Sequence, residues 1–304
     1  MKFFLLLFLA ITLSAQSISR TQVIMSTLVS ITVDEKEIDT LFKAFDVVRD
    51  VDKTLSSYKE NSIISKLNRD KKVKLDTLSY EALSLSLEYY KNSDGYFNIL
   101  IGSITKDLYK FGEEEHVPSK SSLDKAKIDI ELVEFDTSEA KLLEYDAKVD
   151  LGGMGKGFAL DKLNNYLYKQ GVKNAIMSAS GDIRCQKQCL ISVQNPFRKG
   201  MMLSFVTTKQ NLGITTSGNY NRYVKDKTHN HLINPKTKHS QQNFASITLV
   251  GDIKSSALDA YATAISVMPK SKAYCFLDRL GVGYVVVEVN KKTLIKPAGF
   301  FELR

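Results

Sequence analysis

Residues 149–163, VDLGGMGKGFALDKL, contain the feature that most limits how this chain can fold. Four glycines and one lysine occupy the six positions 152–157, between an apolar lead-in and a segment whose apolar residues have helical spacing. Glycine allows tight turns and a close approach of the backbone to another group, so the segment predicts a strand, a tight turn and a helix. The N–H groups at the start of that helix, together with Lys156, can bind an anion. A plain turn that leaves Lys156 in water is the alternative.

Two well-known phosphate-binding motifs are excluded for this segment. A Walker loop needs glycine five residues before the Gly-Lys pair and Ser or Thr after it, and this chain has Asp150 and Gly157 there. The pattern G-x-G-x-x-G is not matched in any register. An anion site here would have to use its own arrangement of backbone N–H groups and charge.

The rest of the chain predicts a mixed α/β fold in one large domain with two lobes. Apolar residues at helical intervals predict helices over 37–56, 79–95, 155–171 and 255–268. Runs rich in β-branched residues predict strands over 21–33, 148–153, 174–183, 190–196, 202–208 and 246–251, and a hairpin over 282–303. Residues 148–183 therefore predict one βαβ-like unit.

The N-terminus predicts a secretory signal peptide over residues 1–15. Lys2 precedes an apolar run, 3–13, and small residues lead to Gln16. Such a run is too short to span a membrane, which takes about twenty residues. A lipoprotein would carry cysteine after the small residues, so we expect no lipid anchor. The sequence predicts an exported protein with its domain over 16–304, in the periplasm or at the outer face of the inner membrane; a buried N-terminal strand or helix is the alternative.

Charge and cysteine content exclude some classes of protein. The formal net charge is +8, with 42 Lys and Arg against 34 Asp and Glu, and these residues are spread out. The sequence has no aromatic and basic motif of the kind that binds nucleic acid. After the N-terminal run, no stretch is apolar enough to span a membrane. The excess charge can steer an anionic ligand or can be solvated surface. A disulfide between Cys185 and Cys189 is one possibility. With Cys275 the number of cysteines is odd, so we expect ordinary cysteines rather than a disulfide framework or a zinc site.

Two further segments hold residues suited to catalysis or metal binding. Residues 228–237 hold His229 and His231 beside a turn-forming Asn-Pro pair. Asp259 and Thr263 lie four apart on one predicted helix and share a face. A carboxylate and a hydroxyl suit Mg²⁺, which binds few protein oxygens and keeps its waters for phosphates. The alternative to metal binding is that Asp259 stabilises the helix through its dipole and Thr263 packs against neighbouring side chains.

Together these segments resemble the ApbE family, the FAD:protein FMN transferases, from about Met25 to about Val267. The resemblance rests on motifs in a fixed order: QVIMSTLVSITV, VDKTLSSYKENSIISKLN, SDGYFNILIGSI, VDLGGMGKGFALD, SGDI, TSGNYNR, HLINPKT and SSALDAYATA. It implies a fold related to the T-fold, with mixed sheets and flanking helices. It also implies an Mg²⁺-dependent enzyme that moves FMN from FAD onto a Thr or Ser of an exported acceptor protein, within a motif Asp-x-x-(Ser/Thr)-Gly-Ala-(Ser/Thr), and releases AMP.

The resemblance also implies roles for particular residues. Its metal ligands fall on Asp259, Thr263 and the backbone carbonyl of Gly155, and its catalytic histidine falls on His231, which acts with Asp259. Its flavin contacts fall on Met25, Tyr96, Phe97, Asn98, Asp150 and Lys156. The glycines then let the backbone approach the flavin pyrophosphate and turn a carbonyl to the metal.

The chain departs from the family pattern at five positions. Asn98, Asn219 and Asn234 stand where the family has Asp, and Ser180 and Lys238 stand where it has Gly. The asparagines remove negative charge and keep the shape, so we expect flavin binding and activity to survive. Two other functions stay open: an Mg²⁺-dependent FAD pyrophosphatase that yields FMN and AMP, and a non-catalytic flavin-binding protein outside the cytoplasm.

Overall fold

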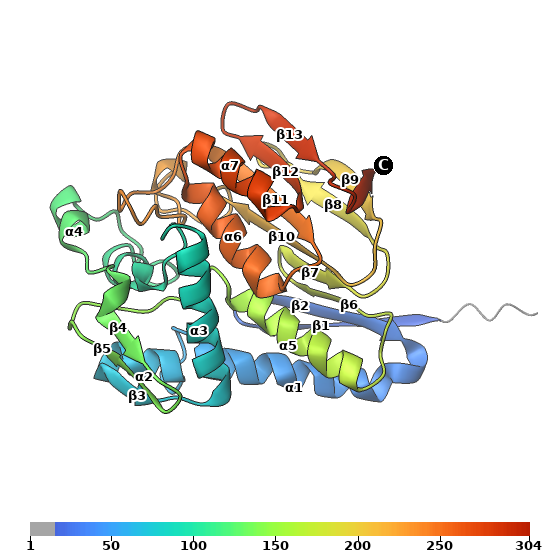
Figure 1. The fold of residues 1–304 in the computed structure, drawn as a ribbon, viewed down its shortest axis with the longest axis horizontal. Coiled ribbons are helices and arrows are strands. Elements are labelled where there is room, and N and C mark those ends of the chain that lie inside the picture. Colours follow the sequence, from blue (N-terminus) through green and yellow to red (C-terminus); the bar gives the residue numbers. More distant parts are fainter. Residues whose placement is uncertain (1–15) are drawn as a thin grey trace, which may run out of the picture.

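The computed structural model describes residues 16–304, and the predicted signal peptide at 1–15 lies outside the described residues. The main feature is an eight-stranded sheet in which every neighbouring pair is antiparallel (Figure 1). Its strands, in spatial order, are β1 (Ser17–Ile24), β2 (Thr27–Asp34), β6 (Ile176–Ala179), β7 (Asp182–Cys185), β10 (Leu212–Gly218), β11 (Phe244–Gly251), β12 (Gly283–Glu288) and β13 (Thr293–Lys296).

Two three-stranded sheets accompany the large one. The first has the order β14 (Phe301–Leu303), β9 (Met201–Thr207), β8 (Leu190–Gln194), and the second β3 (Lys72–Lys74), β5 (Glu139–Leu142), β4 (Val133–Phe135). Phe205 of β9 and Phe301 of β14 pack with Val285 of β12 in one buried cluster. The β8–β9–β14 sheet therefore covers part of one face of the large sheet.

Helices α1 (Ile38–Leu55), α5 (Gly155–Lys169) and α6 (Ser255–Val267) pack against the other face of the large sheet. The remaining helices are α2 (Ile63–Asp70), α3 (Thr77–Asn92), α4 (Lys120–Lys125) and α7 (Lys270–Leu280). Short 3₁₀ or π turns occupy Glu35–Glu37, Ile99–Ile101, Ser103–Leu108, Ile130–Leu132 and Lys227–His229. In Figure 1, α5 lies in front of the β1, β2 and β6 end of the sheet and α6 in front of β10 and β11. No helix within residues 16–304 has the length and apolar character that crossing a membrane requires.

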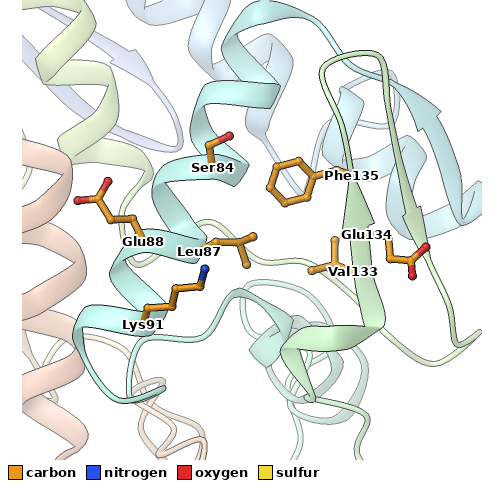
Figure 2. A pocket seen from close by; sticks show the side chains of 7 residues that line it. All are labelled: Ser84, Leu87, Glu88, Lys91, Val133, Glu134 and Phe135. Carbon is orange, nitrogen blue, oxygen red and sulfur yellow. The ribbon is translucent and has the colours of Figure 1, made fainter.

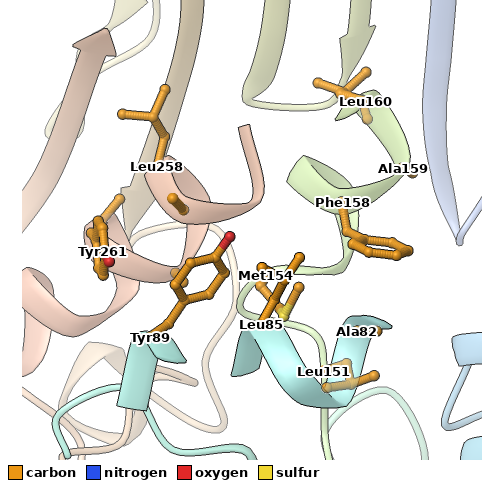
Figure 3. Packing of buried hydrophobic residues seen from close by; sticks show 14 of the residues in the cluster. Ala82, Leu85, Tyr89, Leu151, Met154, Phe158, Ala159, Leu160, Leu258 and Tyr261 are labelled. Atoms are coloured by element: carbon orange, nitrogen blue, oxygen red, sulfur yellow. The ribbon is translucent and has the colours of Figure 1, made fainter. Parts of the chain in front are cut away.

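The mixed α/β fold is confirmed, and so are the predicted helices α1, α3, α5 and α6. Their apolar residues enter one core, in which Tyr89 of α3, Phe158 of α5 and Leu258 of α6 lie close together (Figure 3). The Tyr89 hydroxyl lies 2.9 Å from the Ser256 hydroxyl at the start of α6. The core thereby ties together the three helices on which the predicted site depends.

Two predicted strands are wrong because each is a hairpin. The expected strand 21–33 is β1 and β2, separated by Met25 and Ser26, which both have φ 56°. The expected strand 174–183 is β6 and β7, separated at Ser180, with φ 58°, and Gly181. Non-glycine residues in the left-handed region are uncommon, so composition favoured unbroken strands.

The predicted strand over 148–153 is also wrong, and with it the βαβ-like unit. The Asn68 side chain accepts a hydrogen bond from the Val149 N–H at 2.7 Å and donates one to the Val149 carbonyl at 2.8 Å. The Asp150 N–H donates to the Ile99 carbonyl at 2.7 Å. One asparagine side chain thus takes the place of a neighbouring strand. The predicted hairpin at 282–303 is confirmed for β12 and β13, whereas β14 pairs with β9 in the other sheet.

The expectation of ordinary cysteines at 185 and 189 is wrong. Cys185 and Cys189 form a disulfide with a Cα–Cα distance of 6.4 Å, and Cys275 is free and exposed. The chain leaves the large sheet at Cys185 and enters the small sheet at Leu190, and this short connection brings the two sulfurs together. An odd count of cysteines carries no information about such a local reversal.

Candidate active site

Gly157 lets α5 approach the start of α6. A Cβ added at Gly157 would overlap the Ser255 carbonyl and lie 2.8 Å from the Ser256 Cα. One turn later, Asp161 accepts hydrogen bonds from the Ser255 N–H at 2.7 Å and the Ser256 N–H at 3.0 Å. Asp161 thus satisfies N–H groups that the first turn of α6 leaves without partners. The Lys-Gly-x-x-x-Asp spacing fixes the position of α6 and its Asp259.

We expect Gly157→Ala to lower the free energy of unfolding by about 1–3 kcal/mol, the usual cost of overpacking. The neighbouring substitution Gly155→Ala is the control, because a Cβ there meets only the Met25 methyl at 3.6 Å. Urea unfolding of both variants measures the difference. Equal stability of the two variants would contradict the close helix approach.

Lys156 lies between two buried carboxylates. Its Nζ is 3.1 Å from Asp182 Oδ2 and 3.3 Å from Asp259 Oδ2, and these two carboxylates are 2% and 4% exposed. The Gly157 N–H donates to Asp259 Oδ2 at 3.2 Å, and the Thr215 hydroxyl donates to Asp182 Oδ1. Lys156 comes from α5, Asp182 from β7 and Asp259 from α6.

The charges of this cluster do not balance. Burial and the nearby Asp182 raise the pKa of Asp259 to about 7, against the lowering effect of Lys156. Burial alone would lower the pKa of the Lys156 ammonium, but Asp182 and Asp259 raise it above its ordinary value. Two carboxylates share one ammonium, so the cluster can accept a further cation.

Thr263 lies one turn after Asp259 and brings a backbone carbonyl into the cluster. Its hydroxyl is 3.4 Å from the Gly153 carbonyl oxygen. The predicted backbone ligand is the carbonyl of Gly155, the first residue of α5, and this role stays a prediction. The carbonyl next to Thr263 is that of Gly153, in the turn before the helix.

The available donors fit a hard cation. Within residues 16–304, no group of three or more His, Cys, Asp or Glu side chains is placed to hold a metal ion. A cation at this place would be held by the Asp259 carboxylate, the Thr263 hydroxyl and a backbone carbonyl, that of Gly155 as predicted or that of Gly153, all of them oxygens. Mg²⁺ prefers oxygen ligands and retains several waters, so this small donor set suits it.

Asp150 lies on the other side of the glycine turn. It accepts hydrogen bonds from the Thr105 hydroxyl at 2.7 Å and the Gly152 N–H at 2.9 Å, and Lys106 Nζ is 3.8 Å away. Burial would raise the pKa of Asp150, but Lys106 and these two donors lower it below its ordinary value. Lys106 also lies over the Tyr58 ring, 3.3 Å from the centroid. Asp150 is therefore a fixed carboxylate that orders the turn.

His231 is held by the loop that carries Arg222. Its Nδ1 is 3.1 Å from the Arg222 carbonyl, which also accepts the His231 backbone N–H at 3.2 Å. A carbonyl only accepts, so Nδ1 carries the proton and Nε2 carries the lone pair. Burial, then the charges of Arg222 and Lys156, lower the pKa of His231 to about 4, against the raising effects of the carbonyl and of Asp150. His231 is a neutral imidazole at pH 7.

The Arg222 side chain ties this loop to the opposite side of the site. It donates to the Tyr58 hydroxyl at 2.7 Å, and its guanidinium lies 5.5 Å from the Phe111 ring centroid. The Tyr58 hydroxyl in turn donates to the Phe111 carbonyl at 3.0 Å. The motif TSGNYNR therefore supplies a contact that holds the histidine loop in place.

The predicted flavin contacts lie on several elements around this cluster. A Cβ built at Gly155 would lie 3.6 Å from the Met25 methyl, and one built at Gly153 would lie 3.3 Å from the Phe97 ring. The Met25 N–H donates to Asp52 at 3.2 Å, which holds the β1–β2 turn. Met25 and Phe97 therefore lie beside the glycine turn with Lys156 and Asp150, and their contacts with flavin stay predictions.

Tyr96 and Asn98 have other neighbours. The Tyr96 ring has Lys272 and Lys236 at 5.1 and 5.7 Å from its centroid. Asn98 is buried, donates to the Ile128 carbonyl at 2.7 Å and accepts from the Leu100 N–H at 2.9 Å. Both polar atoms of Asn98 thus hold loops, and its flavin contact stays a prediction.

The departures from the family pattern have local structural reasons. The Asn234 amide donates to the Val267 carbonyl at 2.8 Å, as the Asn98 amide does to Ile128. A carboxylate at either position could not donate. Ser180 and Lys238, at family glycine positions, have φ 58° and 61°, and the Lys238 ammonium also donates to the Asp124 carbonyl at 2.7 Å. Two of the three asparagines therefore serve the fold rather than the charge of the site.

We expect Asn98→Asp to lower the free energy of unfolding by about 1–3 kcal/mol at pH 7, because it leaves the Ile128 carbonyl without its donor. The introduced carboxyl regains a donor when it is protonated, so its pKa is raised in the fold and the penalty shrinks as the pH falls. Urea unfolding at pH 7 and at pH 4 tests both points. Asn165→Asp, on the exposed side of α5, is the control. A pH-independent difference from that control would contradict this role of Asn98.

Cavity shape alone does not identify the site. A cavity of about 590 Å³ opens between α3 and β4, with Leu87 and Phe135 on opposite walls (Figure 2). It contains none of the predicted site residues. A second cavity, of about 460 Å³, is lined by Asn98, Gly95 and Lys236 among others. The site rests instead on the cluster of Lys156, Asp182 and Asp259.

Sequence reasoning missed Asp182 and Gly153. Asp182 stood in the motif SGDI, and Gly153 in the glycine segment, but neither had a role. The available signal for Asp182 was a carboxylate directly after a turn, at the start of a buried strand. No sequence signal indicated the contact between the Gly153 carbonyl and the Thr263 hydroxyl, because it depends on the turn geometry.

Comparisons with known proteins identify relatives of this chain. The model described as the ApbE family matches residues 25–286. A protein named FAD:protein FMN transferase from Buchnera aphidicola subsp. Schizaphis graminum is 27% identical over 269 residues, covering 81% of this chain and 78% of its own. One of the same name from Escherichia coli K12 is 26% identical over 257 residues, covering 78% and 73%.

Solved structures agree in fold. The crystal structure of the ApbE protein from Thermotoga maritima has a TM-score of 0.84 at 22% identity, covering 92% of this chain and 97% of its own. The flavin transferase ApbE from Vibrio cholerae has a TM-score of 0.77 at 19% identity, covering 95% and 97%. The resemblance stated from the motifs and the predicted fold class are confirmed.

Proposed function

The chain belongs to the ApbE family, and from this premise we propose that it is an Mg²⁺-dependent FAD:protein FMN transferase. It moves FMN from FAD onto a Thr or Ser hydroxyl of an acceptor protein and releases AMP. The observation that carries the proposal is the cluster of Lys156, Asp182 and Asp259 beside the Thr263 hydroxyl and the Gly153 carbonyl. Relatives named FAD:protein FMN transferase support the substrate and the type of acceptor.

The chemistry is a transfer between two oxygens. A bond forms between the acceptor hydroxyl oxygen and the FMN phosphorus, and the bond from that phosphorus to the AMP oxygen breaks. Mg²⁺, held by Asp259, Thr263 and the carbonyl of Gly155 or Gly153, would neutralise charge on the pyrophosphate and stabilise AMP as leaving group. Lys156 adds a positive charge next to that site. Catalysis of this kind is mostly positioning and charge neutralisation, which suits residues fixed by α5 and α6.

His231 is the proposed general base. Its Nδ1 is held by the Arg222 carbonyl, so Nε2 can take the proton of the acceptor hydroxyl as that oxygen attacks. Its lowered pKa keeps the imidazole neutral and ready to accept at pH 7. Water at the same place would give FMN and AMP, which is the pyrophosphatase alternative.

We further propose that the protein acts outside the cytoplasm on an exported acceptor with the motif Asp-x-x-(Ser/Thr)-Gly-Ala-(Ser/Thr). The predicted signal peptide at 1–15 supports export. The Cys185–Cys189 disulfide is consistent with an oxidising compartment.

The experiment combines the protein, FAD, Mg²⁺ and an exported FMN-binding domain that carries the acceptor motif. Intact mass spectrometry measures FMN on the acceptor while AMP is followed in parallel. We expect one FMN adduct per AMP. AMP and free FMN with no adduct would replace the proposal by the pyrophosphatase, and bound, unaltered FAD would replace it by a flavin-binding protein.

A further inference from the structure

The Lys156 ammonium lies beside the carboxylate that the proposed divalent cation would need. Its ammonium lies 3.3 Å from Asp259 Oδ2, on the carboxylate that the proposed function gives to Mg²⁺. The buried carboxylate cannot be fully solvated, so its charge is neutralised by whichever cation is next to it. An ammonium and a divalent cation on one carboxylate repel each other strongly at such short range.

Asp182 offers the ammonium a second position. Its Oδ2 is 3.1 Å from Lys156 Nζ, is buried, and accepts no well-directed hydrogen bond from residues 16–304. Its Oδ1 is fixed by the Thr215 hydroxyl. Asp182 belongs to β7, whereas Asp259 and Thr263 belong to α6, so the two carboxylates sit on different elements. Lys156 can shift toward Asp182 without moving either of them.

We propose that Lys156 competes with the divalent cation for Asp259, and that Asp182 is the positioning residue that receives the ammonium when the cation binds. This inference rests on the proposed metal site. In this proposal Asp182 acts by positioning Lys156 and does not bind the metal ion itself. The ammonium keeps divalent affinity low until a ligand with further oxygens, such as a pyrophosphate, adds to the few donors of the protein.

The test measures Mn²⁺ alone, as a spectroscopic substitute for Mg²⁺, by electron paramagnetic resonance with the complete chain at pH 8 and without FAD or acceptor. Lys156→Met removes the competitor, and we expect Mn²⁺ to bind about tenfold more tightly. Asp182→Asn leaves the ammonium only Asp259, and we expect binding to weaken about tenfold. Lys169→Met, at the exposed end of the same helix, has the same change of charge and should leave the affinity nearly unchanged.

The double variant Lys156→Met with Asp182→Asn separates the two roles of Asp182. If Asp182 acts through Lys156, its substitution has little effect once Lys156 is gone. A tenfold loss in that background would make Asp182 a metal ligand and overturn the inference. An unchanged affinity in Lys156→Met would also overturn it.

Two further variants keep the result interpretable. Lys156→Arg retains the positive charge and should not show the tighter binding, so it covers the case in which the methionine variant folds poorly. Asp259→Asn should lose the Mn²⁺ site. Retained Mn²⁺ binding in that variant would show that Asp259 is not part of the metal site, and this would overturn the inference. Because these measurements use no flavin, affinities in the expected order without any FMN adduct would leave the inference standing and remove the transferase proposal.

Discussion

Asp259→Asn is expected to lower Mg²⁺-dependent turnover of FAD by about a thousandfold, the upper range for removal of one charge-stabilising group from an active site. Asparagine has the shape of aspartate, and its oxygen can still accept the Gly157 N–H that now bonds Asp259 at 3.2 Å. Lys156 keeps Asp182 as a partner at 3.1 Å. The substitution therefore removes the charge that the proposed cation would need and leaves the surrounding contacts in place.

The measurement is AMP release as a function of Mg²⁺ concentration, with urea unfolding as a check of the fold. We do not expect the free energy of unfolding to fall, because burial raises the pKa of Asp259, so its charged form costs stability that the neutral asparagine does not. Asp278→Asn, an exposed aspartate on α7 paired with Lys296, is the matched control. Turnover of Asp259→Asn close to that of the control would remove Asp259 from the metal site.

Much of the fold follows from short-range sequence patterns. The helices α1, α3, α5 and α6 each have apolar residues at helical intervals, and burial of that face is what makes them helices. The hairpin turn at Met25 and Ser26 could not be predicted, because methionine is not a usual turn residue and both residues adopt positive φ, which is uncommon outside glycine. The segment at Val149 could not be predicted either, since its hydrogen-bond partner is the side chain of Asn68, 81 residues away.

The candidate site divides in the same way. Lys156, Asp259 and Thr263 lie in ordered motifs with local spacing, so the sequence indicates them. Asp182 joins them only because the sheet order places β7 next to β10, under α6. Strands far apart in the sequence must pair for Asp182 to reach the site, so no local sequence pattern predicts its position.

His231→Gln is expected to slow FMN transfer by about 10²- to 10⁴-fold, the usual contribution of a general base, while FAD affinity changes less than about threefold. The imidazole is held through Nδ1 by the Arg222 carbonyl, and glutamine can make that contact without providing a base at Nε2. Single-turnover transfer and FAD titration give the two quantities separately. His229→Gln, on the same loop, controls for loss of an imidazole as such. Equal losses of rate and affinity in His231→Gln would make His231 a binding residue.

The pH dependence gives a second, independent reading of the same residue. Only the neutral imidazole can take the proton, and burial together with Arg222 and Lys156 lowers the pKa of His231 to about 4. An ordinary histidine is half protonated near pH 6.5, so it would lose half its activity there, whereas His231 stays neutral until the pH falls much further. With Mg²⁺ and FAD saturating, the transfer rate should therefore remain level from pH 8 to pH 6. A rate that halves near pH 6.5 in the natural protein, but not in His231→Gln, would show that the environment does not hold this imidazole neutral.

The low pKa of His231 also makes it a weaker base, so proton transfer from the acceptor hydroxyl to Nε2 is less favourable. Such a base is effective if a cation bound at Asp259, as proposed, would make the phosphorus more electrophilic, so the proposed roles of His231 and of the metal site depend on each other.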